Sequence, residues 1–320
     1  MKIEKKERIK LIVTIPAYNE EESIGKVIKE IPRKIEGIDK VEIIVISDGS
    51  TDNTVKVAKD VGADIILESV PKRGLGPTFK DGLNAAIDNG ADVIVNIDAD
   101  NQYNALQIPK LINPILEGKA DIVLGSRFAG TIEHMTIQKK LGNKLATFVV
   151  CMASGIKISD GQTGFRAISR DAALRLVIHS GYTYTQEMIV QAAHKRMAIV
   201  EVPIEFRKRF GESRLISSVF KYAKNSVITL IRNYTYYNPL KTFSIIGGSL
   251  FLIGLLFGFK VLVHYILTGF VQPYFPTALL ASVMMIIGFQ IIIMGLIADI
   301  EHMNRHIMEE ILYRLRQHNK

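Results

Sequence analysis

The stretch VIVNIDAD, residues 93–100, indicates how the chain folds. Its first five residues are almost all apolar and β-branched, which is typical of a strand buried on both faces of a parallel sheet. Asp98 and Asp100 follow directly where that strand ends. In open parallel sheets, ligands bind beyond the carboxyl ends of the strands. The stretch therefore predicts a buried strand that presents two carboxylates to a binding site.

The same alternation of short apolar runs and helical patterns extends to both sides of this stretch. Strands are expected at residues 10–15, 41–46, 65–67, 93–97, 122–124 and 199–202. Helices are expected at residues 20–31, 54–61, 75–89, 106–116, 138–154, 171–178 and 185–195. Strands that alternate with helices predict an α/β fold, with a mostly parallel sheet covered by helices on both faces.

Two long apolar segments lie in the C-terminal third. Residues 243–267 contain one charge, Lys260, and residues 277–298 contain none. Each exceeds the roughly 20 residues that cross a bilayer core. The connector, residues 268–276, lacks Lys and Arg, whereas basic residues crowd both outer flanks. The positive-inside rule then predicts a transmembrane hairpin with the main domain and both termini in the cytoplasm. Two buried helices of a soluble core are the alternative.

Composition and charge narrow the class of partner. The chain has 320 residues, of which 48% are hydrophobic, and a formal net charge of +8. That charge favours an anionic partner, such as a nucleotide or a lipid headgroup. Nucleic acid is not expected, because the basic residues follow the membrane flanks and the phosphate motifs. The charged first ten residues do not form a secretory signal. One cysteine, Cys151, excludes an intrachain disulfide.

The motif Asp98-Ala99-Asp100 is the strongest chemical signal. Two carboxylates two residues apart at a strand end can project toward one site, and Gln102 adds a further oxygen. Mg²⁺ and Mn²⁺ prefer such hard oxygen ligands and commonly coordinate substrate phosphates at the same time. The alternative is an exposed acidic turn.

Two further polar motifs follow the first two strands. PAYNE, residues 16–20, offers a flat tyrosine ring for a base, although a turn and helix cap is the alternative. In SDGSTD, residues 47–52, Asp48 has an acceptor for a base or ribose. Thr51 or Asp52 in the same motif can cap the following helix.

In order and spacing, PAYNE, SDGSTDNT and IDAD resemble the family 2 glycosyltransferases, which have the GT-A fold. The resemblance covers roughly residues 10–215. It continues through residues 74–76 (GLG), 125–127 (GSR), 162–166 (QTGFR), 202–204 (VPI) and 211–214 (GESR). The most similar subgroup is the dolichyl-phosphate mannose or glucose synthases, including bacterial polyprenyl-phosphate glycosyltransferases with a C-terminal hairpin.

The resemblance implies roles for individual residues. The nucleotide would be held by Pro16, Tyr18, Glu20, Ile46 and Asp48. Its diphosphate and the metal would face Asp98, Ala99, Asp100 and Gln102, with Asp98, Asp100 and Gln102 as metal ligands. Arg127, Arg209 and Arg214 would surround the donor and acceptor phosphates, and the catalytic set would be Asp100, Arg127 and Arg209.

The chain departs from the family pattern at several positions. Ser47 stands where a second Asp is frequent, and Arg214 stands where Lys is common. Residues 206–214 are one residue shorter than a common form, so that Lys208 and Arg209 compete for one role. The chain has no Trp and therefore lacks the Gln-x-x-Arg-Trp motif of processive synthases, which favours single transfer.

The expected function is metal-dependent, inverting transfer of one hexose, mannose or glucose, from GDP-Man or UDP-Glc to dolichyl or polyprenyl phosphate. Transfer to diacylglycerol or a protein, and a non-catalytic membrane scaffold, are the alternatives. The expected domains are a catalytic domain (1–214), an amphipathic interfacial region (215–238), the hairpin (239–299) and a cytoplasmic terminal helix (300–320). A homo-oligomer is left open.

Overall fold

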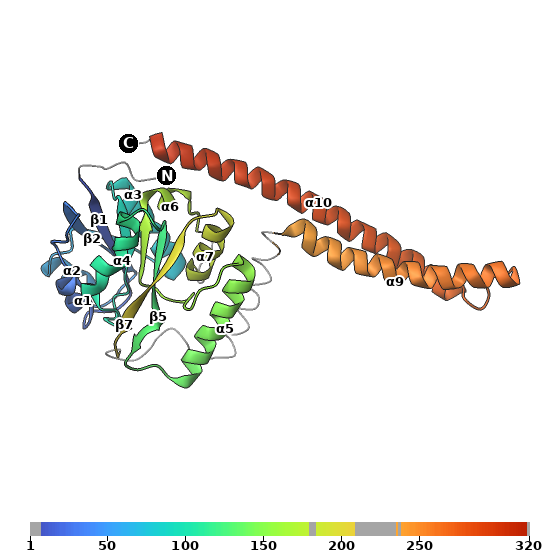
Figure 1. Ribbon diagram of the computed structural model, residues 1–320, viewed down its shortest axis with the longest axis horizontal. Coiled ribbons are helices and arrows are strands. Elements are labelled where there is room, and N and C mark those ends of the chain that lie inside the picture. The colour runs from blue at the N-terminus through green and yellow to red at the C-terminus, as the bar shows by residue number, and fades with distance from the viewer. Residues whose placement is uncertain (1–7, 179–183, 209–234, 236–237, 319–320) are drawn as a thin grey trace. The chain divides into compact units, whose positions relative to one another are not determined.

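The computed structural model describes residues 8–178, 184–208, 235 and 238–318, in two units (Figure 1). Unit 1 comprises residues 1–230 with 319–320, and unit 2 comprises residues 231–318. Most of the predicted interfacial region lies outside the described residues, and so do Arg209 and Arg214. The predicted domain boundaries stay predictions.

Unit 1 is built on a seven-stranded sheet with the order β3-β2-β1-β4-β6-β5-β7. The strands are β1 (Lys10–Ala17), β2 (Lys40–Asp48), β3 (Ile65–Ser69), β4 (Val93–Asn96), β5 (Ile122–Ile132), β6 (Arg166–Ser169) and β7 (Ile199–Phe206). The pairs β1–β2, β1–β4, β2–β3 and β5–β7 are parallel, and β6 runs antiparallel between β4 and β5. The prediction of a mostly parallel sheet is confirmed.

Helices cover both faces because the central strands are apolar on both sides. Val13 pairs with Ile43 and with Val95, and these three side chains join the core beneath α1, α2 and α4. The intervening residues of β2, Ile44 and Ile46, are also buried, on the face of the sheet that α3 covers. The helices are α1 (Ile24–Glu30), α2 (Thr54–Asp60), α3 (Leu75–Asp88), α4 (Ile108–Leu116), α5 (Ile137–Ser154), α6 (Arg170–Arg175) and α7 (Tyr184–His194).

Two features of the sheet differ from the expectation. Strand β6 was not predicted, because it is only four residues long and follows a glycine-containing loop. Strands β5 and β7 are longer than the predicted residues 122–124 and 199–202, because they pair with each other beyond a register shift between Ser126 and Thr131. Both features build the edge of the sheet beside the strand end that carries the aspartates.

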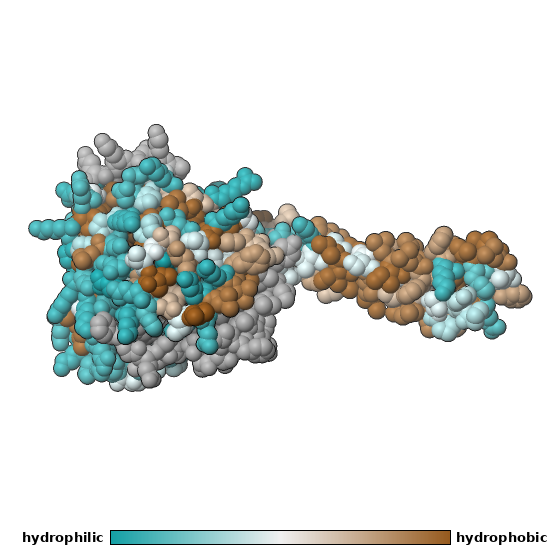
Figure 2. Space-filling model, turned by 60° about the horizontal axis from the view of Figure 1, so that its bottom comes forward, coloured by the Kyte–Doolittle hydropathy of each residue, from teal (hydrophilic) through white to brown (hydrophobic). Residues whose placement is uncertain are grey.

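Unit 2 is an antiparallel pair of helices, α9 (Pro239–Thr268) and α10 (Phe275–His318). Both are long and apolar enough to cross a membrane, and their surface is mostly hydrophobic (Figure 2). Small residues repeat every seven positions along the contact between them. The buried residues of this seam are Gly247, Gly254 and Val261 on α9 and Ala281, Gly288 and Gly295 on α10. Residues 300–318 of the predicted terminal helix continue α10 without a break.

Candidate active site

The ends of β1 and β2 are joined by reciprocal hydrogen bonds. Asn19, in the left-handed conformation with φ 54°, donates its backbone N–H to Ser50 Oγ at 3.1 Å and accepts from the N–H of Thr51 at 2.8 Å. The N–H of Glu20 donates to Thr54 Oγ1 at 2.8 Å. Because β1 and β2 are parallel neighbours, PAYNE and SDGSTD therefore form one continuous rim at the carboxyl edge of the sheet.

Asp48 organises the loop that closes this rim. Its Oδ1 accepts from the N–H of Arg73 at 2.7 Å, and its Oδ2 accepts from the N–H of Gly74 at 2.9 Å. The same loop places Lys72 Nζ 3.4 Å from the ring centroid of Tyr18, a cation–π contact. Asp48 was predicted to contact a base or ribose. The structure shows that each carboxylate oxygen already accepts a backbone hydrogen bond.

Asp98 lies directly over Gly164. A Cβ atom at position 164 would stand 2.5 Å from Asp98 Oδ2 and 2.7 Å from Oδ1. Gly164 is itself held at both ends: Asn96 Nδ2 donates to its carbonyl at 2.8 Å, and its N–H donates to Tyr103 Oη at 2.9 Å. The loop before β6 therefore confines the Asp98 carboxylate, and only glycine leaves it room.

Tyr103 stays protonated in this position. Burial, together with the charges of Asp98 and Asp160, raises the pKa of its hydroxyl to about 12, while the charge of Arg127 acts in the opposite direction. The side chain is 3% exposed and packs against Phe165 and Phe206. A neutral phenol therefore supports the loop under the aspartates at any ordinary pH.

The residues around Asp98 and Asp100 suit a divalent cation. Both carboxylates are half-buried, and Asn101, the next residue, carries a buried Oδ1 with no hydrogen-bond partner among the described residues. The described part of the chain contains no cluster of three or more His, Cys, Asp or Glu side chains able to hold a metal. A site with few protein ligands fits Mg²⁺ or Mn²⁺, which takes its other oxygens from water and phosphate.

Gln102 connects the aspartates to the end of β7. Its N–H donates to Asp100 Oδ1 at 3.1 Å, and its carbonyl accepts from the N–H of Arg207 at 2.7 Å. The neighbouring Lys208 is therefore brought to the same edge of the sheet. The predicted metal contact of Gln102 stays a prediction.

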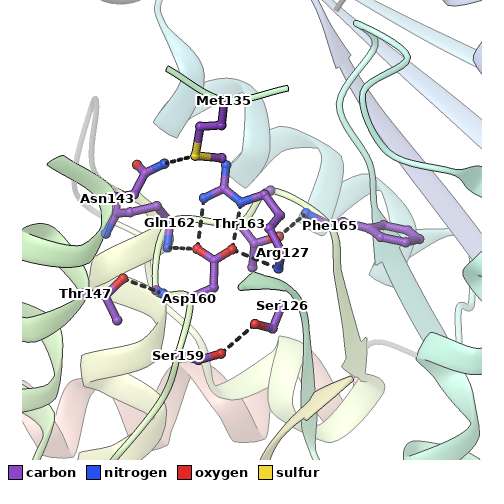
Figure 3. A network of polar contacts seen from close by, with 12 residues as sticks. Ser126, Arg127, Met135, Asn143, Thr147, Ser159, Asp160, Gln162, Thr163 and Phe165 are labelled. Carbon is purple, nitrogen blue, oxygen red and sulfur yellow. Dashed lines mark hydrogen bonds and ion pairs between the residues drawn. The ribbon is translucent and has the colours of Figure 1, made fainter. Parts of the chain in front are cut away.

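Arg127 faces Asp160 in a buried, two-pronged ion pair (Figure 3). Its Nε donates to Oδ2 at 2.7 Å and its Nη2 to Oδ1 at 2.9 Å. Burial alone would lower the pKa of Arg127, but the hydrogen bonds and the charge of Asp160 raise it above its ordinary value. Since Arg has five N–H donors, the pair leaves some for a further anion. The phosphate contact stays a prediction, for a residue that is only 7% exposed.

Glu201 holds Asp160 in place from the neighbouring strand. Its Oε1 accepts from the N–H of Asp160 at 3.0 Å, and both of its oxygens accept from the N–H of Ser159. Ser159 in turn shares a hydrogen bond of 2.5 Å with Ser126, beside Arg127 (Figure 3). Neither Asp160 nor Glu201 was predicted as a site residue, because their partners lie 33 and 42 residues away along the chain.

Arg166 supplies a second, fully buried cation. It donates to the carbonyls of Thr163 at 2.8 Å, Thr185 at 2.8 Å and Gly161 at 3.0 Å. Burial lowers the pKa of Arg166 to about 10, so the guanidinium remains charged at neutral pH. The contacts to Gly161 and Thr163 fix the loop of residues 161–165 beside Asp98 and Asp160, and the contact to Thr185 ties this loop to α7.

Other predicted nucleotide contacts lie along the rim. Pro16 is within β1, and Ile46 and Ala99 are 1% and 3% exposed, so their side chains belong to the core. Glu20 Oε2 accepts from Ser23 Oγ at 2.9 Å at the start of α1. Asp52 accepts from the N–H of Thr54 at 3.0 Å, as the capping interpretation predicts.

Family models match both units of the chain. Residues 12–176 match the model of glycosyl transferase family 2, and residues 226–301 match that of the family 2 C-terminal transmembrane region. The chain belongs to glycosyl transferase family 2. The predicted family and the predicted enzyme class, a glycosyltransferase, are confirmed.

Two archaeal proteins are among the relatives similar to this chain. The chain is 32% identical to a UDP-N-acetylglucosamine–dolichyl-phosphate N-acetylglucosaminyltransferase of Methanococcus voltae, over 61% of this chain and 84% of the relative. It is 30% identical to a dolichol-phosphate mannosyltransferase of Pyrococcus furiosus, over 75% of this chain and 69% of the relative. Both relatives are named for transfer that involves dolichyl or dolichol phosphate.

Solved structures share the fold of unit 1. Glucosyl-3-phosphoglycerate synthase of Mycobacterium tuberculosis, crystallised with Mn²⁺, UDP and phosphoglyceric acid, matches with a TM-score of 0.57 at 23% identity. The match covers 71% of this chain and 78% of that one. It shows the GT-A-like fold, as predicted. Together with the transmembrane region, the fold defines a membrane-associated glycosyltransferase.

Proposed function

We propose that the protein transfers a single hexose from a nucleotide sugar to dolichyl or another polyprenyl phosphate, with inversion at the anomeric carbon. The observation that supports this proposal most directly is the position of Asp98 and Asp100. They lie at the carboxyl end of β4, next to the joined rims of β1 and β2. Relatives named for dolichyl-phosphate acceptors support the acceptor. GDP-mannose and UDP-glucose are the donors to test first.

Within this proposal the donor lies along the carboxyl edge of the sheet. The ring of Tyr18 offers a flat surface for the base, and the loop held by Asp48 borders it. Asp98 and Asp100 would hold Mg²⁺ or Mn²⁺ against the diphosphate. When bound, the cation would neutralise charge on the leaving nucleoside diphosphate.

The acceptor needs little activation because a lipid monophosphate is already an anion near neutral pH. One phosphate oxygen forms a bond to the anomeric carbon while the bond from that carbon to the diphosphate oxygen breaks, and the nucleoside diphosphate leaves with the electron pair. Two anions must meet, so cationic side chains are required. Arg127 is proposed to face the acceptor phosphate with the donors that Asp160 leaves open. Most of the rate enhancement would come from positioning and charge stabilisation.

The membrane hairpin keeps this reaction at a bilayer surface. We propose that the catalytic domain and both termini are cytoplasmic, because the basic flanks of α9 and α10 lie on the same side of the pair and their connector lacks Lys and Arg. The proposed acceptor carries its phosphate in that headgroup plane.

The test is donor screening with and without the aspartate pair. Membranes that contain the protein are given each labelled nucleotide sugar in turn, and the label in extracted polyprenyl lipid is counted. We expect one donor to label the lipid, and Asp100→Asn to lower that transfer by about a thousandfold or more while the protein still folds. Full activity in Asp100→Asn would remove the metal assignment.

Two alternatives give different outcomes in this experiment. Label in diacylglycerol or in protein instead of polyprenyl lipid would replace the acceptor and keep the enzyme class. No binding of any nucleotide sugar would favour a non-catalytic scaffold.

A further inference from the structure

Helix α5 exposes an apolar stripe on the surface of unit 1. Five large hydrophobic side chains on it are between 52% and 85% exposed: Ile137, Leu141, Leu145, Phe148 and Met152. At 3.6 residues per turn they fall within an arc of about 80°. The buried residues of α5, Ala146, Thr147 and Val150, lie on the opposite side of the helix. The stripe therefore points away from the domain to which α5 is attached.

The charge around the stripe is entirely positive. Residues 134–159 contain four lysines and neither Asp nor Glu. These lysines, all exposed, are Lys139, Lys140, Lys144 and Lys157. By the same helical geometry Lys140 and Lys144 border the stripe on one side, whereas Lys139 lies away from it. Lysines beside an apolar face are typical of helices that lie in the interface of anionic bilayers. A contiguous exposed apolar patch on a globular unit also indicates an interaction surface.

We propose that α5 docks unit 1 onto an anionic lipid bilayer. The apolar stripe would enter the boundary between headgroups and acyl chains, and the lysines would contact lipid phosphates. A bilayer is favoured over a protein partner because the charged residues that border the stripe are cationic, and because the same chain carries two helices long enough to span a membrane. The proposal does not depend on which sugar, or whether any sugar, is transferred.

The inner face of α5 connects this surface to the candidate active site. Thr147 Oγ1 accepts from the N–H of Gly161 at 3.0 Å, next to Asp160. Lys144 Nζ lies 5.9 Å from the ring centroid of Phe128, which follows Arg127. Docking through α5 would therefore hold the Arg127–Asp160 side of the site close to the headgroup plane.

The experiment uses the full chain in lipid nanodiscs, without donor or acceptor. In a Cys151→Ser background, Leu145→Cys carries an environment-sensitive fluorophore, and the discs contain nitroxide-labelled lipid and about 30 mol% anionic lipid. We expect the nitroxide to remove most of the fluorescence. Lys56→Cys, labelled in the same way on exposed α2, is the matched control and should keep its fluorescence.

The charge requirement is tested in the same discs. The combined change Lys139→Gln, Lys140→Gln and Lys144→Gln should reduce the quenching at position 145, and so should neutral lipid. Quenching at position 145 by aqueous iodide alone would overturn the proposal. Protection from both quenchers would overturn it in favour of a protein partner. Because no substrate is present, these outcomes are independent of the proposed transfer reaction.

Discussion

Unit 1 and unit 2 bury opposite kinds of residue. The sheet of unit 1 buries large aliphatic side chains such as Ile43, Ile44 and Val45, which are completely inaccessible. The helix pair of unit 2 buries glycine along its seam and exposes Leu256 and Ile266, which are 69% and 71% accessible. The buried positions are therefore occupied by large aliphatic side chains in unit 1 and mainly by glycine in unit 2.

The solvent explains the difference. In water, removing apolar area contributes roughly 25 cal/mol per Å², so large side chains go inside. Lipid tails are as apolar as leucine, so burying a large side chain between membrane helices gains little, and close van der Waals packing of small residues contributes more. A Cβ at Gly288 would stand 2.7 Å from the carbonyl oxygen of Gly247. The helix backbones are that close only because no side chain separates them.

The largest expected effect is on the free energy of unfolding. It comes from a comparison in which one aliphatic side chain in each unit is replaced by alanine. Ile44→Ala removes a fully buried side chain of β2 and should lower the free energy of unfolding by about 2–5 kcal/mol. Leu256→Ala removes an exposed one from α9 and should change it by no more than about 0.5 kcal/mol. Denaturant unfolding of the full chain in mild detergent measures both. Equal losses would show that the hairpin surface is packed against protein.

The second comparison concerns Gly164. This glycine leaves room for the Asp98 carboxylate, whereas Gly288 leaves room for the backbone of the neighbouring helix. Gly164→Ala would place a Cβ against the Asp98 carboxylate and displace it, and we expect kcat/KM for sugar transfer to fall about a hundredfold or more. Gly161→Ala, three residues earlier, meets no atom closer than 3.4 Å and should keep most of the activity. Normal activity in Gly164→Ala would show that the Asp98 position is not critical.

The third comparison tests the seam itself. Gly288→Leu forces a side chain against the backbone of Gly247 and Phe251, and we expect the helix pair to lose about 1–3 kcal/mol of stability. Loss of helical circular dichroism during SDS titration reports this change. Gly248→Leu is the control, since a Cβ there has no neighbour within 4 Å. If both variants behave alike, the seam is not the packing surface.

The smallest expected effect is on nucleotide binding. The comparison removes a lysine–tyrosine contact from each unit. Lys72 lies 3.4 Å from the ring centroid of Tyr18, and Lys260 lies 4.9 Å from that of Tyr274. Lys72→Gln should weaken nucleotide binding about two- to fivefold, because the tyrosine loses a contact of about 0.5–1 kcal/mol. Lys260→Gln should leave nucleotide binding unchanged. Isothermal titration with the nucleoside diphosphate distinguishes them, and equal effects would exclude Tyr18 from the base site.

Much of the fold was predictable from local patterns. The buried strand of residues 93–97 and the apolar segments on either side of the connector at 268–276 show their periodicity and length within short windows. The short β6 was missed, because four residues carry too little pattern. The lengths of β5 and β7 were also missed, since each depends on the other strand as a pairing partner.

For the candidate site, the sequence by itself determined which chemical groups are present: two aspartates at a strand end and a polar rim with a tyrosine, in a chain that also carries two long apolar segments. Only the tertiary structure decided that Gly164 lies beneath Asp98 and that Asp160 engages Arg127. The physical reason is the separation along the chain of the residues that interact. Strand ends and apolar spans follow from neighbours along the chain, whereas a steric limit on a carboxylate and an ion pair across 33 residues arise only when β4, β5 and β6 are packed side by side.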